Sequence, residues 1–315
     1  MKKPFFRSTI FRIGLRAAVS LGLMYIIFQL TNVNDILAAL QQANLFYIVL
    51  ALFLVLFNLG FQIAKWHYLL AKVSPLPFRQ VLASFFFGLT LGSFTPGQIG
   101  EFGGRALNIT NQETGVVVGL TIIDRLQVFA VMTIAGLLGM VHIFQVQSFL
   151  ILAGVAAIAS LAISMIFRPD LLRRFLERIG VSRLKHRWIR QILESWSLLS
   201  TRDIAITIFL TVCFYLTIYL QLFLLFGAFS WWVPVEVFYG FSAMMFLKSL
   251  LPISIADLGT RELGLVYFMG LQGIPKSAAF DSSILLFSIN ILLPALVGLY
   301  FFPKEFSHLR PTSNE

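Results

Sequence analysis

The chain has 315 residues, of which 58% are hydrophobic and 12% charged, and its mean hydropathy is +0.86. Soluble domains carry about 25% charged residues, so the composition excludes a soluble globular protein, a disordered chain and a nucleic-acid-binding protein as first interpretations. We therefore expect an integral membrane protein. Its net charge of +10 then raises the question of which side of the membrane holds the cations.

Six stretches are predicted to be full membrane-spanning helices. A bilayer core about 30 Å thick requires about 20 mostly apolar residues per helix. In chain order, the stretches that meet or approach this length are 13–30, 45–64, 116–141, 148–167, 204–229 and 284–302. The predicted fold class is therefore an all-α polytopic integral membrane protein.

Two further apolar runs, 81–94 and 235–251, are shorter and are followed closely by Pro96 and Pro252. Proline lacks a backbone donor and clashes with the preceding turn, so we predict that each helix breaks there. A broken segment at membrane depth survives only where protein or water covers its backbone groups. Both runs are therefore candidate re-entrant hairpins.

The distribution of lysine and arginine predicts the orientation. Nineteen of the 24 cations lie in four segments, which are 1–16, 65–80, 168–203 and the C-terminal tail, whereas the loops between them on the other side hold only Lys276. Because cytoplasmic loops are enriched in cations, we place both termini in the cytoplasm and the chain in the plasma (inner) membrane.

The same count sets the orientation of the two hairpins. The topology closes only if neither hairpin crosses the membrane, so hairpin 81–105 opens to the cytoplasm and hairpin 235–273 opens to the outside. We therefore divide the chain into an N-terminal half (1–167), a basic amphipathic cytoplasmic linker (168–203) and a C-terminal half (204–315). The linker is interpreted as an anchor on the anionic leaflet, with a dedicated lipid-recruitment site as the alternative.

The two hairpins share a motif, which is proline, an acid five residues on, then glycine and arginine. The matching residues are Pro96, Glu101, Gly103 and Arg105 in one hairpin and Pro252, Asp257, Gly259 and Arg261 in the other. Inverted repeats with interrupted segments in matching positions indicate the central site of a transporter. The structural alternative is that proline and glycine only shape the breaks, while each acid neutralises the arginine four residues later.

This pattern favours a site for a lipid head group. The new half-helix expected after each proline presents free N–H groups, which attract phosphate, and an arginine adds a bidentate fork. The acids would hold the arginines or meet a cationic head group. The candidate substrate-binding residues are Pro96, Gln98, Glu101, Arg105, Lys248, Pro252, Ser254, Asp257 and Arg261.

Three other charged positions are less central. Asp124 and Arg125 lie inside a predicted span and are secondary candidates, either as a structural ion pair or as lining residues. Glu262 is adjacent to Arg261 and is expected to point elsewhere.

At these residues the chain resembles the lysylphosphatidylglycerol synthase transmembrane-region (flippase-like) family. The stretches that carry the resemblance are 95–101 with Arg105, the pair at 124–125, and 251–254 with 259–262. The resemblance implies movement of lipids between leaflets, in the best-known members an aminoacylated phosphatidylglycerol. Members often have a basic residue where Gln98 stands and a glycine where Ala256 stands, so the head group stays open.

The expected function is thus a lipid flippase for a phosphate-containing lipid, with aminoacylated and polyprenyl-linked lipids as the candidate classes. The alternatives are an integral membrane enzyme acting on a lipid-linked phosphate, and an accessory subunit of a lipid or glycan pathway. Bifunctional members carry a soluble aminoacyltransferase domain after the spans, and because only thirteen residues follow Phe302, we expect no synthase activity. We expect no cofactor, metal or nucleic acid; the expected partners are membrane lipids, and the oligomeric state stays open.

Overall fold

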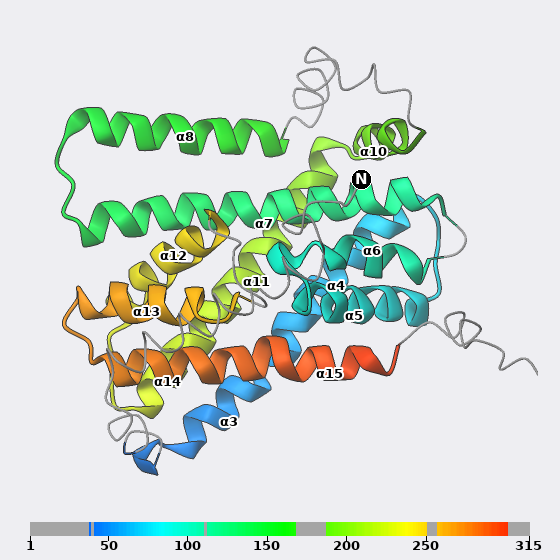
Figure 1. Ribbon diagram of the computed structural model, residues 1–315. Coiled ribbons are helices and arrows are strands. Elements are labelled where there is room, and N and C mark those ends of the chain that lie inside the picture. Colours follow the sequence, from blue (N-terminus) through cyan, green and yellow to red (C-terminus); the bar gives the residue numbers. More distant parts are fainter. Residues whose placement is uncertain (1–37, 39–40, 110–111, 168–186, 251–256, 302–315) are drawn as a thin grey trace, which may run out of the picture.

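The computed structural model describes residues 38, 41–109, 112–167, 187–250 and 257–301. Every regular element in these residues is helical (Figure 1). In chain order the elements are α3 (Leu45–Phe53), α4 (Val55–Ala71), α5 (Phe78–Ser93), a 3-10 turn (Pro96–Gln98), α6 (Gly100–Leu107), α7 (Thr114–Ile143), α8 (Phe149–Phe167), α10 (Arg187–Ser197), α11 (Thr201–Ala228), α12 (Pro234–Leu250), α13 (Thr260–Gly270), α14 (Lys276–Phe287), a π-helical turn (Ser288–Leu292) and α15 (Leu293–Leu299).

Four helical stretches in this part of the chain are long and apolar enough to cross a membrane. They are Leu45–Ala71, Thr114–Ile143, Thr201–Ala228 and Lys276–Leu299. They confirm four predicted stretches as long apolar helices, and α8 coincides with the predicted stretch 148–167. The predicted stretch 13–30 lies outside the described residues. The chain is therefore a polytopic helical membrane protein.

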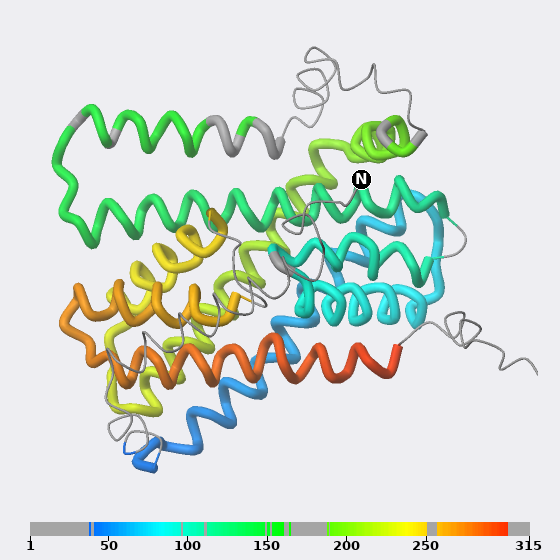
Figure 2. Tube along the Cα trace, viewed as in Figure 1, coloured from blue at the N-terminus to red at the C-terminus, as the bar shows by residue number. Residues whose placement is uncertain are grey.

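The two short apolar runs form helical hairpins, α5–α6 and α12–α13. Figure 2 shows that the open ends of the two hairpins lie at opposite ends of the molecule, and that the tip of α5–α6 and the described inner ends of α12 and α13 lie near its centre. Helix α5 ends at Ser93, shortly before Pro96, where proline predicts a break. Helix α12 is described up to Leu250, and the predicted break at Pro252 lies outside the described residues.

The tip of hairpin α5–α6 is closed by a threonine and two left-handed residues. Gly97 and Gln98 have φ of 59° and 57°. The hydroxyl of Thr95 donates to the carbonyl of Leu91 (2.9 Å) and accepts from the amide of Gly100 (2.6 Å). This hydroxyl satisfies backbone groups at the end of one helix and the start of the next, so the chain reverses with few exposed polar groups.

Each hairpin packs against the long helix that follows the other hairpin. Helix α12 lies on α7, where a Cβ added to Gly139 would approach the carbonyl oxygen of Tyr239 to 2.6 Å. Helix α5 lies on α15, where the hydroxyl of Thr90 donates to the carbonyl of Ala295 at 2.9 Å, and Gly298 lies against the same threonine. Glycine permits both close approaches, and the two contacts hold the hairpins at a fixed spacing.

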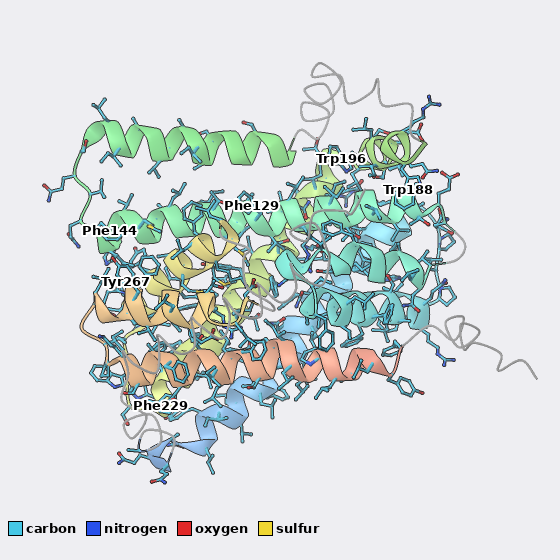
Figure 3. All side chains as sticks on the ribbon, viewed as in Figure 1. Phe129, Phe144, Trp188, Trp196, Phe229 and Tyr267 are labelled. Atoms are coloured by element: carbon cyan, nitrogen blue, oxygen red, sulfur yellow. The ribbon has the colours of Figure 1, made fainter. Side chains whose placement is uncertain are left out.

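Helix α10 docks on the N-terminal part of α7. The indole Nε1 of Trp196 donates to the carbonyl of Gly119 at 3.1 Å, and Trp196 is buried between the two helices (Figure 3). The predicted amphipathic linker is thus helical in its second part, and the buried face of α10 contacts the protein. Residues 168–186 of the predicted linker lie outside the described residues.

Candidate functional site

A cavity of about 300 Å³ lies between the tip of hairpin α5–α6 and the facing ends of α12 and α13. Apolar residues of α7, α11 and α12 form part of its wall: Phe129, Met132, Phe214, Ile218, Phe241 and Met245. Six of the candidate site residues also line it: Gln98, Glu101, Arg125, Lys248, Asp257 and Arg261. Residues that are far apart in the sequence, from both hairpins and from α7, thus surround one cavity.

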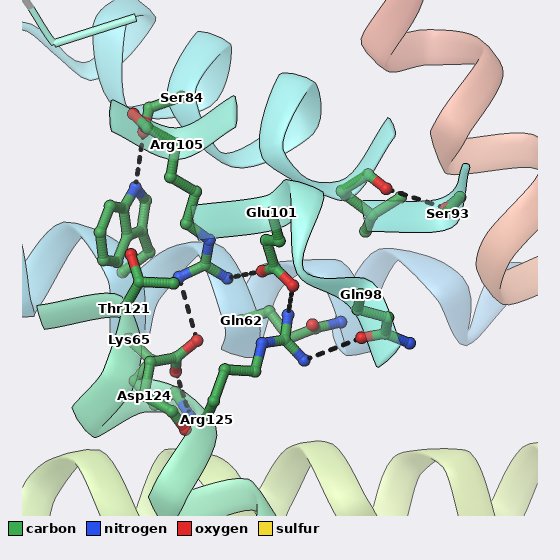
Figure 4. Close-up of polar contacts among 12 residues, drawn as sticks. Gln62, Lys65, Ser84, Ser93, Gln98, Glu101, Arg105, Thr121, Asp124 and Arg125 are labelled. Atoms are coloured by element: carbon green, nitrogen blue, oxygen red, sulfur yellow. Dashed lines mark hydrogen bonds and ion pairs between the residues drawn. The ribbon is translucent and has the colours of Figure 1, made fainter. Parts of the chain in front are cut away.

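A chain of ion pairs runs from α4 through α7 to hairpin α5–α6 (Figure 4). Lys65 Nζ pairs with Asp124 Oδ1, and Asp124 Oδ2 lies 3.0 Å from Arg105 Nη1. Arg105 Nη2 lies 2.5 Å from Glu101 Oε1, and the other oxygen of Glu101 pairs with Arg125 Nη2. The predicted local pair between Glu101 and Arg105 is confirmed. Asp124 and Arg125, for which both a structural ion pair and a lining role were open, do not pair with each other. Asp124 binds Lys65 and Arg105, whereas Arg125 binds Glu101 and lines the cavity.

Arg105 is enclosed by aromatic side chains and is not among the residues that line the cavity. Its guanidinium carbon lies 4.4 Å from the ring centroid of Trp66 and 5.6 Å from that of Phe85. The indole of Trp66 donates to the hydroxyl of Ser84, which in turn donates to the Arg105 carbonyl at 2.7 Å. With 1% of its surface exposed, Arg105 is held in place on several sides. It therefore acts on the cavity through Glu101.

Arg125 is the cation of this network that faces the cavity. Its side chain is 30% exposed, against 2% for that of Arg105. Its Nε is buried without a hydrogen-bond partner among the described residues, and its Nη1 lies 3.4 Å from Gln98 Oε1, at the long limit of a hydrogen bond. Arg125 thus retains unused donor capacity beside the cavity.

Hairpin α12–α13 holds two separate ion pairs. Lys248 Nζ lies 2.8 Å from Asp257 Oδ2, so Lys248 reaches the cavity wall as predicted. Arg261 pairs with Glu262, which also accepts from the amide of Gly259 at 2.6 Å. The expectation that Glu262 points elsewhere is wrong, because its carboxylate closes the first turn of α13 and holds Arg261 from the same side.

Gln98 joins the two hairpins. Its Oε1 accepts from Arg125, and its Nε2 donates to Asp257 Oδ2 at 3.4 Å. A connected network therefore spans the molecule, with Lys65, Arg105, Arg125 and Lys248 against Asp124, Glu101 and Asp257. Four cations against three acids leave the network with one positive charge in excess, and the separate pair of Arg261 and Glu262 adds no net charge.

Neither half-helix begins directly at the proline that precedes it. Helix α6 begins at Gly100 and α13 at Thr260, several residues after Pro96 and Pro252. Pro96 lies in the 3-10 turn. Pro252 and Ser254 lie outside the described residues.

Sequence reasoning missed Lys65, which it assigned to a cytoplasmic loop. Helix α4 continues to Ala71, so Lys65 lies inside the spanning stretch, 4% exposed and paired with Asp124. The loop assignment is wrong because the predicted stretch 45–64 stops at Lys65, the first cation, whereas the helix continues past it. The presence of an acid in another span was the available signal, since an intramembrane acid usually has a partner.

Sequence reasoning also missed a group of carboxamides. Asn58, Gln62 and Asn290 line the cavity, and Gln221 is hydrogen-bonded to Asn58 and Asn290. Uncharged polar residues within long apolar stretches were the signal that could have found them. In the described part of the chain, no group of three or more histidine, cysteine, aspartate or glutamate side chains is arranged to hold a metal ion.

The fold and the cavity together define a polytopic helical membrane protein with a charged internal site between two helical hairpins. The chain belongs to the lysylphosphatidylglycerol synthase TM region family, whose model matches residues 13–298. Among curated proteins, the comparison found no significant match. The family assignment confirms the resemblance that the short motifs indicated, and it makes the chain a lipid-related membrane protein.

Proposed function

We propose that the protein moves a phosphate-containing lipid between the two leaflets of the membrane and holds its head group in the cavity between the hairpin tips. The observation that carries this proposal is Arg125, which lines the cavity with a side chain that is 30% exposed, in a network of net positive charge. An arginine with free donors binds phosphate strongly when water is scarce. Lys248 and Arg261 place two further cationic side chains at the cavity from the opposite hairpin, each paired with an acid.

We further propose that the hairpins are re-entrant, with α5–α6 opening to the cytoplasm and α12–α13 to the outside. The packing supports an inverted repeat. Helix α5 lies on α15, which follows the other hairpin, and α12 lies on α7, which follows the first. Rocking of one half against the other would open the cavity alternately to the two sides. In this arrangement both termini lie in the cytoplasm, and the protein lies in the inner membrane.

Transport is tested in proteoliposomes by following a fluorescent phospholipid that an impermeant quencher reaches only in the outer leaflet. We expect the purified protein to accelerate exchange, and Arg125→Ala to slow it about tenfold or more, since a charge-assisted hydrogen bond contributes about 1.5–3 kcal/mol. Arg202→Ala, at an exposed position at the start of α11, is the matched control and should transport normally. Normal transport by Arg125→Ala would sink the site assignment.

The same experiment addresses the enzyme alternative. If the lipid is recovered chemically altered while its exchange stays at the rate of protein-free liposomes, the cavity is a reaction site. Recovery of unaltered lipid together with accelerated exchange favours transport.

The proposed orientation is tested by labelling single cysteines in intact cells, in a chain whose native Cys213 is replaced by serine. Arg79→Cys, at the open end of hairpin α5–α6, should react only with reagents that reach the cytoplasm. Lys276→Cys, at the open end of hairpin α12–α13, should react with impermeant reagents from outside. Labelling of both positions from one side would contradict opposed hairpins.

A further inference from the structure

The cavity has a second polar wall that carries no charge. Gln62 Nε2 donates to Asn58 Oδ1 (2.6 Å), and Asn58 Nδ2 donates to Asn290 Oδ1 (3.1 Å). Asn290 Nδ2 donates to Gln221 Oε1 (2.9 Å), while Gln221 Nε2 is fixed by the carbonyl of Ala51 (3.0 Å). Four carboxamides from α4, α11 and the π-helical turn are thus locked to one another beside the cavity.

The local backbone positions this wall. Asn290 lies in the π-helical turn Ser288–Leu292 between α14 and α15. π-Helical turns are rare within helices and are frequent at functional sites. Asn58 is 2% exposed and Gln221 is fully buried. Burying this many amide groups among apolar spans is costly unless they are hydrogen-bonded, and the network meets that requirement.

Two members of the wall keep hydrogen-bonding capacity. Among the hydrogen bonds of the described residues, Gln62 uses one of its two N–H groups and leaves its Oε1 free, and Asn290 uses one of its two N–H groups. Both side chains line the cavity. This combination of donors and an acceptor complements a hydroxyl group, which both donates and accepts.

Among the described residues that line the cavity, no carboxylate is left to receive a cation. Its two carboxylates are already paired, Glu101 with Arg105 and Arg125, and Asp257 with Lys248. An ammonium group on the ligand would enter a site whose network already carries one excess positive charge, so its entry would be disfavoured by charge repulsion.

We infer that the head group carries an uncharged, hydroxyl-bearing group beyond its phosphate, of the class of glycerol, inositol and sugar phosphodiesters, and not an amine. The phosphate lies against Arg125, and the hydroxyls lie against Gln62 and Asn290. This inference rests on the proposed function and narrows its substrate class.

The test compares three lipids with identical acyl chains and fluorophores: phosphatidylglycerol, phosphatidic acid and aminoacylated phosphatidylglycerol. Exchange is measured in proteoliposomes, and the thermal stabilisation of the detergent-solubilised protein by each lipid is measured in parallel. We expect the transport rate and the apparent affinity to be higher for phosphatidylglycerol than for phosphatidic acid. The difference should be about fivefold for each hydrogen bond that a glycerol hydroxyl forms with the cavity. The aminoacylated phosphatidylglycerol should be exchanged more slowly than phosphatidylglycerol and should stabilise the protein less.

The critical variant is Gln62→Met, which keeps the side-chain volume and removes the free amide. It should lower the phosphatidylglycerol rate to that of phosphatidic acid while leaving the phosphatidic acid rate unchanged. Gln127→Met is the matched control, because Gln127 is a buried amide that joins α7 to α11 through Thr207 (2.8 Å) and does not line the cavity. The control should preserve the ratio between the two lipids.

The outcomes separate the two proposals. Equal rates for phosphatidylglycerol and phosphatidic acid, a preference for the aminoacylated lipid, or a proportional loss for both lipids in Gln62→Met would overturn the inference while transport itself stands. If no lipid moves faster than in protein-free liposomes but phosphatidylglycerol stabilises the protein selectively and Gln62→Met removes that selectivity, the inference stands and the transport proposal falls. If neither transport nor selective stabilisation occurs, both fall.

Discussion

Hairpins α5–α6 and α12–α13 carry the same motif but pair their charges differently. In the first hairpin the acid binds the arginine four residues later, Glu101 with Arg105. In the second, Asp257 binds Lys248 on the preceding helix. The second arginine, Arg261, binds the adjacent Glu262. A shared sequence motif thus specifies which residue types are present without specifying their partners.

The backbone at the two acids explains the difference. Glu101 lies in the first turn of α6, where residues four apart share a helical face. Asp257 precedes α13 and has a φ of 59°, so the helical spacing rule does not apply to it. A shift of a few residues in where the helix begins therefore exchanges a local pair for a long-range one.

The largest effect should come from Glu101→Gln, which leaves Arg105 and Arg125 without their shared acid. Breaking a buried ion pair by removing one partner costs about 3–5 kcal/mol. The equivalent change in the other hairpin, Asp257→Asn, should cost less, because the side chain of Lys248 is 14% exposed and reaches the cavity. Both values are measured by denaturant titration in detergent micelles. A larger loss for Asp257→Asn would reverse the comparison.

The next effect concerns the helices on which the hairpins lie. Gly298→Ala should lower the free energy of unfolding by about 1–3 kcal/mol, because a Cβ there meets Thr90 and the backbone of Phe86. Gly136→Ala should have a similar effect at the contact between α7 and α12, where a Cβ lies 2.9 Å from the carbonyl of Ser242. Gly103→Ala is the control, since a Cβ there meets nothing within 4 Å, and it should be neutral or stabilising.

A double-mutant cycle sharpens the contrast between the two motifs. The coupling energy of Glu101 with Arg105 should be about 1–2 kcal/mol, within the range measured for residues in contact. The coupling energy of Asp257 with Arg261 should be about 0.5 kcal/mol or less, because each binds another residue. The cycles use alanine variants and their free energies of unfolding in micelles. Equal coupling in both hairpins would show that the second motif also acts as a local pair.

The smallest effect on stability should come from Gln98→Ala, which removes the link between the hairpins. Its two hydrogen bonds are both 3.4 Å long, so we expect a loss of about 1 kcal/mol or less. The comparison is with Glu101→Gln under the same conditions. A loss as large as that of Glu101→Gln would mean that the contact between the tips contributes as much as the buried ion pairs.

Features that depend on local sequence were predictable. The long apolar stretches 116–141 and 204–229 correspond to α7 and α11, and helix α5 ends shortly before Pro96. The hydropathy of a stretch and the missing N–H donor of proline depend only on neighbouring residues, so both can be recognised in the sequence. The pairing of Glu101 with Arg105 was predictable for the same reason, because the helix places them side by side.

The partners of Lys65 and Arg125 were not predictable in this way. Lys65 binds Asp124 and Arg125 binds Glu101, in each case across two helices. The spacing of charges in the sequence contains no record of which helices will be neighbours. Asn58 and Asn290 likewise meet only because α4 and the π-helical turn lie on the same side of the cavity.

The sequence by itself thus determined a polytopic helical membrane protein with two proline-broken segments and a repeated set of charges, because composition, hydropathy and backbone chemistry are local properties. Only the tertiary structure decided which of those charges face the cavity. A charge inside a membrane protein must find an opposite charge or a polar group, and helix packing determines which one is within reach. For that reason Arg105 lies in the core, whereas Arg125 faces the cavity.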